Sequence, residues 1–153
     1  MMIRHAPLDI EKIKNLIVDT RKFTDDLMNL TSQSFEDWAA DRHQIALSEH
    51  YIERATENIL TIGTHFLSRF PSKLKDYEEV ILFLGRENIV PMNFAEKNRA
   101  LSKFRNLLVH QYWEVEPKRL FDIIKKHLDD LEKFCDYFEE VLRNPGKWGL
   151  KVE

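Results

Sequence analysis

Residues 117 to 141 read PKRLFDIIKKHLDDLEKFCDYFEEV, and the spacing of their apolar side chains is the most regular in the chain. Apolar residues recur every three or four positions, the period that places them on one stripe of an α-helix. The stripe consists of Leu120, Ile123, Ile124, Leu128, Leu131, Phe134, Phe138 and Val141. Pro117 suits the first turn of this helix, and Asn144-Pro145-Gly146 stops it. The stretch therefore predicts one long helix with a single buried face.

Upstream of this stretch, the same period predicts four more helices. The first covers roughly residues 8 to 30, and the second is unusually long, from a Ser34 cap before Phe35 as far as Phe70. A short third helix covers 77 to 86, and a fourth follows an Asn93 cap and ends near His110. Four substantial helices and one short one, joined by short links, predict an all-α fold, an antiparallel four-helix bundle with one additional short helix.

The composition agrees with a single helical domain. The chain has 153 residues, of which 43% are apolar and 32% charged, and only four are glycine. We expect one domain over residues 8–143 and a C-terminal tail over 144–153 that docks onto the body of the protein. Cys135 is the only cysteine, which excludes an internal disulfide and predicts a thiol packed in the core.

Charge limits the function classes. A formal net charge of -3 gives no general attraction for nucleic acid, so RNA binding would need a local basic patch. Charged residues from Arg4 to Lys12 interrupt the N-terminal segment and leave no apolar stretch for a signal peptide or a membrane span. We therefore expect a cytoplasmic protein that does not contact the membrane.

The residues with the clearest chemistry lie at the end of the fourth predicted helix, which reads RNLLVHQY over 105–112. The Arg105 guanidinium supplies a fixed charge that can grip phosphate, and His110 can exchange protons near neutral pH. An Arg and a His are sufficient to cleave RNA without a metal, by attack of a ribose 2'-hydroxyl on the adjoining phosphate. Asn106 could hold the phosphate or the imidazole, and Tyr112 could add a hydrogen bond or stack on a base.

Helix geometry separates the two main groups. At about 100° per residue, Arg105 and His110 lie roughly 140° apart, so one straight helix cannot aim both at a single target. Either the helix loosens before His110, or two copies of the chain place their fourth helices together, and we favour the dimer. Arg99, Lys103, Asn106 and His110 fall within an arc of about 60° and form a basic, exposed face.

The segment KFRNLLVHQYW, residues 103–113, closely resembles the signature of HepT-type toxins in the HEPN superfamily. The resemblance extends over roughly residues 8 to 143, from FEDW at 35–38 to LDDLE at 128–132. It implies a homodimeric, HEPN-like helical bundle whose composite cleft cleaves RNA, with Arg105 and His110 as catalytic residues and Asn106 and Tyr112 in support.

The same resemblance implies a partner and a means of control. HepT-like toxins pair with an MntA-like nucleotidyltransferase antitoxin, which transfers AMP from ATP to the motif tyrosine, here Tyr112. A bulky anion on that phenol would occupy the place of the RNA phosphate. The family often has Gly or Glu where this chain has Gln111. No cofactor is implied, and no metal site is expected.

Other readings stay open at this point. The chain could be a non-catalytic adaptor that holds a nucleotidyltransferase, with Arg105 and His110 in structural hydrogen bonds, or a nucleotide-binding regulator that uses the basic face. His43 and His50 lie seven residues apart on the long helix near carboxylates, which suggests a metal site only weakly because the spacing is too wide. A polar lining for the dimer cleft fits these two histidines better.

Overall fold

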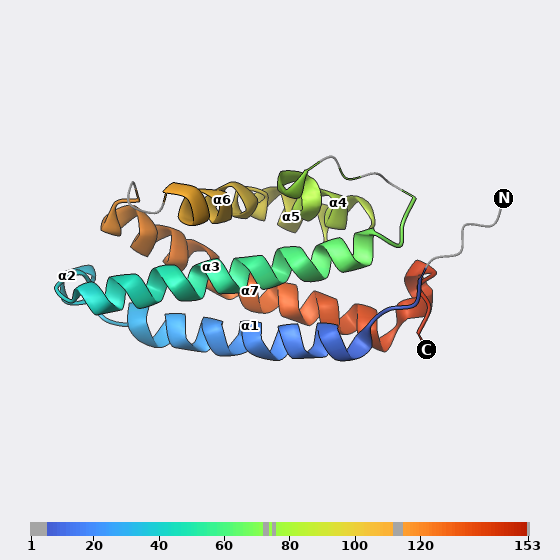
Figure 1. Ribbon diagram of the computed structural model, residues 1–153, viewed down its shortest axis with the longest axis horizontal. Coiled ribbons are helices and arrows are strands. Elements are labelled where there is room, and N and C mark those ends of the chain that lie inside the picture. Colours follow the sequence, from blue (N-terminus) through green and yellow to red (C-terminus); the bar gives the residue numbers. More distant parts are fainter. Residues whose placement is uncertain (1–5, 72–73, 75, 112–114, 153) are drawn as a thin grey trace.

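The computed structural model of the chain describes residues 6–71, 74, 76–111 and 115–152. Within these residues the regular secondary structure is helical, and three long helices set the length of the molecule (Figure 1). These are α1 (Ile10–Thr31), α3 (Arg42–Leu67) and α7 (Pro117–Arg143). A further layer consists of α4 (Val80–Arg86), α5 (Met92–Asn98) and α6 (Leu101–Gln111), and α2 (Phe35–Ala39) covers one end. Short 3-10 turns span Tyr77–Glu79 and Pro145–Trp148.

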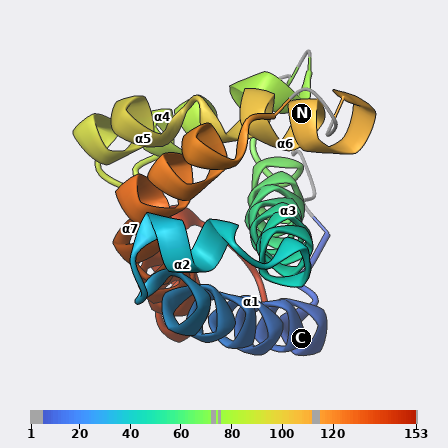
Figure 2. The same cartoon turned by 90° about the vertical axis from the view of Figure 1, so that its left-hand side faces the viewer.

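Successive layers run in opposite directions, which confirms the predicted antiparallel four-helix arrangement. The chain runs along α1, back along α3, forward again through α4 to α6, and back along α7 (Figure 1). Viewed along the bundle, α1, α3 and α7 enclose a common core, and the layer from α4 to α6 lies above α3 and α7 (Figure 2). α6 therefore lies near the end of the bundle that is remote from both chain termini (Figure 1).

The core is formed by the apolar stripes that the sequence predicts. Its largest fully buried side chains include Trp38, Phe66, Phe134 and Phe138. Cys135 is buried among them, as predicted, and burial raises the pKa of its thiol to about 12. In the part of the chain that the structure describes, none of the helices combines the length and the apolar character that crossing a membrane requires.

The first and last predicted helices are confirmed. α1 begins after Asp9, whose carboxylate accepts a hydrogen bond from the Lys12 backbone N–H at 3.1 Å. α7 has Pro117 in its first turn, where the missing N–H costs nothing. α1 begins two residues later than predicted and ends one residue later, and α7 continues to Arg143.

The prediction of one unbroken helix from 35 to 70 is wrong, because α2 and α3 are separate. Asp41 adopts an extended conformation between them, and its carboxylate accepts from the His43 backbone N–H at 2.8 Å. An aspartate in this role begins a new helix rather than continuing the old one. The break lets Trp38 turn into the core, where its indole N–H donates to Ser48 Oγ at 2.9 Å.

The fourth predicted helix is also divided, into α5 and α6. It begins at Met92 with Pro91 as its N-cap, so Asn93 is not the cap. The division follows Asn98, a buried residue whose side-chain N–H donates to the Phe94 carbonyl at 3.0 Å. The other side-chain atom of this amide, Oδ1, lies 2.8 Å from His127 Nδ1 on α7. Asn98 thus ties the end of α5 to α7 and leaves α6 to begin in a new direction.

The C-terminal tail docks onto the body of the protein, as predicted. Leu150 is buried, and the Trp148 indole N–H donates to the Asn88 carbonyl at 3.1 Å. The Leu8 backbone N–H donates to the Lys151 carbonyl at 2.9 Å, so the two terminal segments lie side by side. The boundary of the domain at residue 143 stays a prediction.

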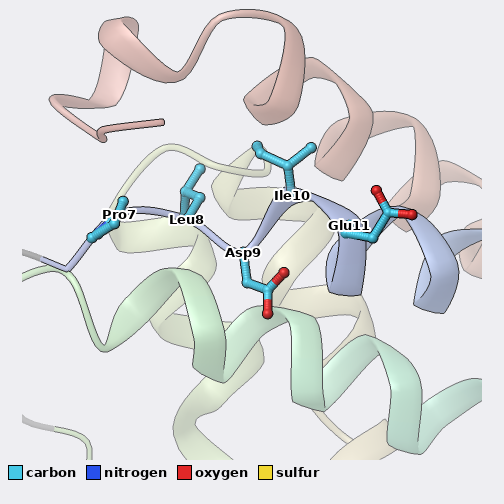
Figure 3. A pocket seen from close by; sticks show the side chains of 5 residues that line it. All are labelled: Pro7, Leu8, Asp9, Ile10 and Glu11. Carbon is cyan, nitrogen blue, oxygen red and sulfur yellow. The ribbon is translucent and has the colours of Figure 1, made fainter. Parts of the chain in front are cut away.

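The N-terminal segment is also attached to α3. The Asp9 backbone N–H donates to His65 Nε2 at 3.1 Å, and the Arg69 guanidinium donates to the Pro7 carbonyl at 2.8 Å. A hollow of about 480 Å³ lies beside residues 7–11, with the Asp9 carboxylate pointing toward α3 and Ile10 pointing the opposite way (Figure 3). This hollow lies near the termini, at the opposite end of the bundle from the last turn of α6 (Figure 1).

Candidate active site on the sixth helix

Arg105 is half-buried on α6, and its guanidinium contacts Glu57 and Asn106 among the described residues. Its Nε donates to Glu57 Oε2 on α3 at 2.5 Å, and its Nη1 donates to Asn106 Oδ1 at 2.9 Å. The side chains of Arg105 and Glu57 each retain 22% of their exposure. Hydrogen bonds between charged groups are short and directional, so these contacts fix the plane of the guanidinium while part of it still faces solvent.

His110 lies in the last turn of α6 and is exposed. α6 is continuous from Leu101 to Gln111, so the suggestion that the helix loosens before His110 is wrong. The separation of roughly 140° between Arg105 and His110 on a regular helix therefore stands, and one copy of the chain does not bring the two groups together. Tyr112 lies outside the residues that the structure describes.

A hollow of about 290 Å³ lies between α3 and the C-terminal half of α6, lined by Ala46, Glu49, His50, Glu53, Leu108 and Val109. His50 is thus part of a polar lining beside α6, whereas His43 is exposed elsewhere on α3. Burial raises the pKa of Glu49 above its usual value. Across the described ranges, no group of three or more His, Cys, Asp or Glu side chains is placed to hold a metal ion.

Glu57 is the site residue that the sequence prediction missed. It is 48 positions from Arg105, and pairing across that distance depends on how α3 and α6 are rotated against each other. The available signal was the spacing of Glu49, Glu53 and Glu57, which recur every four residues on the long helix. That spacing places an acidic row on one face, and a buried or half-buried carboxylate usually has a cationic partner.

The fold and α6 together define a class of protein. It is an antiparallel helical bundle that carries an Arg and a His five positions apart in the C-terminal half of α6. The family model described as "Ribonuclease HepT-like" matches residues 10–138. The chain therefore belongs to the HepT-like ribonuclease family, as its motif predicts. A curated relative, the tRNA nuclease HepT of Aphanizomenon flos-aquae, is 28% identical over 116 residues, which cover 71% of this chain and 78% of the relative.

Solved structures confirm the fold. YutE of Bacillus subtilis, a cytosolic protein of unknown function, superposes with a TM-score of 0.75 at 21% identity, covering 90% of this chain and 93% of its own. A tri-AMPylated HEPN toxin of Shewanella oneidensis in complex with an MNT antitoxin gives a TM-score of 0.74 at 18% identity, covering 86% and 98%. A toxin–antitoxin structure with AMP-PNP gives 0.72 at 18% identity, covering 85% and 98%.

Proposed function

We propose that this chain is the toxin of a toxin–antitoxin pair and an endoribonuclease that cleaves RNA in a cleft formed by two copies. One observation carries the proposal: Glu57 and Asn106 orient the Arg105 guanidinium without covering it, on the same regular helix that presents an exposed His110. The name of the Aphanizomenon relative makes tRNA the first substrate to test.

The chemistry follows from the two side chains. The ribose 2'-oxygen attacks the adjoining phosphorus, the bond from phosphorus to O5' breaks, and the products are a 2',3'-cyclic phosphate and a free 5'-hydroxyl. His110 accepts the 2'-proton, and an imidazolium delivers a proton to the departing O5'. Arg105 stabilises the negative charge that develops on the phosphate oxygens, and Asn106 keeps the guanidinium in plane. Every step is served by groups of the chain, so the route is independent of metal.

The homodimer is part of the proposal. Because α6 stays helical through His110, Arg105 and His110 of one copy point in different directions. A two-fold axis beside α6 would place the Arg105 of one copy opposite the His110 of its partner. Two imidazoles in one cleft would also supply the base and the acid that the two proton transfers need.

Control of the nuclease rests on Tyr112. We infer that a nucleotidyltransferase antitoxin transfers AMP from ATP to the Tyr112 phenol, with release of pyrophosphate. The solved complex of an AMPylated HEPN toxin with an MNT antitoxin supports this inference by likeness of fold. The added phosphate places negative charge two residues from His110, where it would repel an RNA phosphate.

The decisive experiment is cleavage of a tRNA transcript by the purified chain. Arg105→Ala and His110→Ala should each reduce the rate on the order of a hundredfold or more, because each removes a group that acts in the transition state. Lys22→Ala, on the exposed surface of α1, is the control and should cleave normally. Undiminished cleavage by both site variants contradicts the proposal, and intact RNA with the unaltered dimer favours the adaptor reading.

The modification has its own test. After co-expression with the antitoxin, the intact mass of the chain should increase by whole AMP units, and peptide mapping should place at least one on Tyr112. Tyr112→Phe should lose that increment and stay active in the presence of the antitoxin. An unshifted mass, or AMP attached only elsewhere, would refute this part.

A further inference from the structure

A groove between α6 and α7 is lined by both cations and apolar side chains. It has a volume of about 470 Å³, and three of its lining residues are cations: Lys103 from α6, and Arg119 and Lys126 from α7. Its floor is apolar, with Phe104, Leu107 and Ile123 among the lining residues. A volume of a few hundred Å³ with an apolar floor and a few charged groups is typical of a small-ligand or nucleotide site.

Among the described residues, none of the three groove cations has a carboxylate partner within salt-bridge distance. On α7, Lys118, Lys133 and Arg143 each pair with an acidic side chain. No salt bridge among the described residues engages the three groove cations. No acidic residue in the described ranges lines the groove either. Three unneutralised positive charges around one hollow, in a chain of net charge -3, form a local site for an anion.

The floor of the groove also contains a buried polar group. His127 is only 5% exposed, and its Nδ1 lies 2.8 Å from the side-chain oxygen of Asn98. An amide oxygen only accepts, so Nδ1 carries the proton. Burial lowers the pKa of His127, and the ring is therefore neutral near pH 7, with Nε2 as an acceptor. Such an acceptor suits a ribose hydroxyl or the N–H of a base, and not a phosphate.

The three cations form a row that extends toward His110 at the end of α6. Lys103, Leu107 and His110 fall within an arc of about 60° on α6, so the groove runs along the side of the helix that carries His110. α6 and α7 run in opposite directions (Figure 1), which places Arg119 toward the His110 end of the groove and Lys126 toward the far end. An RNA strand bound along this row of cations would extend directly to His110.

We propose that the α6–α7 groove binds a nucleoside phosphate, with the phosphate on Lys103, Arg119 and Lys126 and the base against Phe104, Leu107 and Ile123. Resting on the proposed nuclease function, we assign the ligand as a nucleotide of the RNA substrate that flanks the scissile bond. The groove thus selects the substrate by gripping one unpaired nucleotide beside the cleavage position.

The test measures RNA binding rather than cleavage, so that failure of the nuclease and failure of the groove give different results. All variants carry His110→Ala to keep the RNA intact, and the probe is a fluorescein-labelled tRNA transcript followed by anisotropy. Lys126→Glu should weaken binding on the order of tenfold and lower the salt slope by about 1, since one phosphate contact is lost. Lys22→Glu makes the same change of charge on α1 and should weaken binding by less than about twofold.

Two further measurements complete the test. Ile123→Ala should weaken binding without changing the salt slope, because it removes apolar contact and no charge. AMP is then added as a competitor of the labelled RNA. If AMP competes and Lys126→Glu abolishes the competition, the groove also binds free nucleotides. If AMP does not compete, the groove binds the nucleotide only as part of the RNA strand. Thermal melts check that each variant is folded. Equal effects of Lys126→Glu and Lys22→Glu would overturn the proposal, and unchanged affinity in Ile123→Ala would overturn the placement of the base.

Discussion

Glu57 determines how Arg105 can act. A free arginine side chain samples many rotamers, and ordering it at the moment of reaction costs free energy. Here the carboxylate on α3 holds Nε, so the half-buried guanidinium can meet a phosphate in a fixed plane. Glu57 is in this view a positioning residue, which acts through Arg105 and does not itself touch RNA.

We therefore expect Glu57→Ala to lower kcat for RNA cleavage on the order of tenfold while KM changes little, because misorientation of a transition-state group affects the chemical step most. Glu57→Gln keeps an acceptor of the same shape and should restore part of the loss. Single-turnover kinetics would check this, with Glu11→Gln on the exposed face of α1 as the control. A purely structural role predicts lower thermal stability with kcat unchanged in the folded protein.

At the scale of elements, the fold depends on the close approach of α3 and α4. Gly63 lies near the C-terminal end of α3, and a Cβ placed there would lie 2.8 Å from Val80 Cγ1 and 3.1 Å from Leu84 Cδ1. A glycine in a helix costs roughly 1 kcal/mol relative to alanine, and here the close packing of two helices offsets that cost. The layer that carries α6 is thus packed against the bundle at this contact.

Gly63→Val should destabilise the protein by about 1–3 kcal/mol, the usual cost of overpacking a core position. Chemical denaturation would measure the loss in the free energy of unfolding, and we expect the m-value to stay unchanged. Gly146→Ala serves as the matched control, since no atom lies within 4 Å of its added Cβ, and it should leave the midpoint almost unchanged. A neutral Gly63→Val would mean that α4 moves away from α3 at little cost.

The helices were predictable from the sequence because their apolar stripes repeat over many turns. The breaks were not, since the stripe passes through Asp41 and through Asn98 without a gap, and only the caps and the buried amide divide the helices. The proposed catalytic pair, Arg105 and His110, was visible as a motif within one helix. The Glu57 contact and the groove cations come from different helices, and which residues face each other there depends on helix rotation that no local spacing encodes.

At the scale of the whole molecule, two histidines make stability depend on pH: His65, which is half-buried, and His127, which is buried. His65 accepts the hydrogen bond from the Asp9 N–H that anchors α1, and burial, aided by nearby Arg69 and Lys12, lowers its pKa to about 4. Burial lowers the pKa of His127 as well. In the unfolded chain both imidazoles return to a pKa near 6.5.

The unfolded chain therefore binds more protons than the folded one between about pH 6.5 and pH 4, and stability should fall as the pH drops through that window. We expect Tm to decline from about pH 7 to about pH 5, a range above most carboxyl titrations. His65→Gln should have a lower Tm at neutral pH and a flatter profile, whereas exposed His43→Gln should match the parent. A parent Tm that is constant over this range would contradict the assignment.

The buried position of Cys135 has a practical consequence for testing the proposed dimer. The Cys135 thiol is fully buried and its pKa is raised to about 12, so it reacts negligibly with maleimides. Cysteine-directed dyes therefore do not label the native protein. One new cysteine at an exposed helix position would then carry a single fluorophore per subunit with no background labelling. Energy transfer between differently labelled subunits would report how close the two α6 helices come, without any change to the interior.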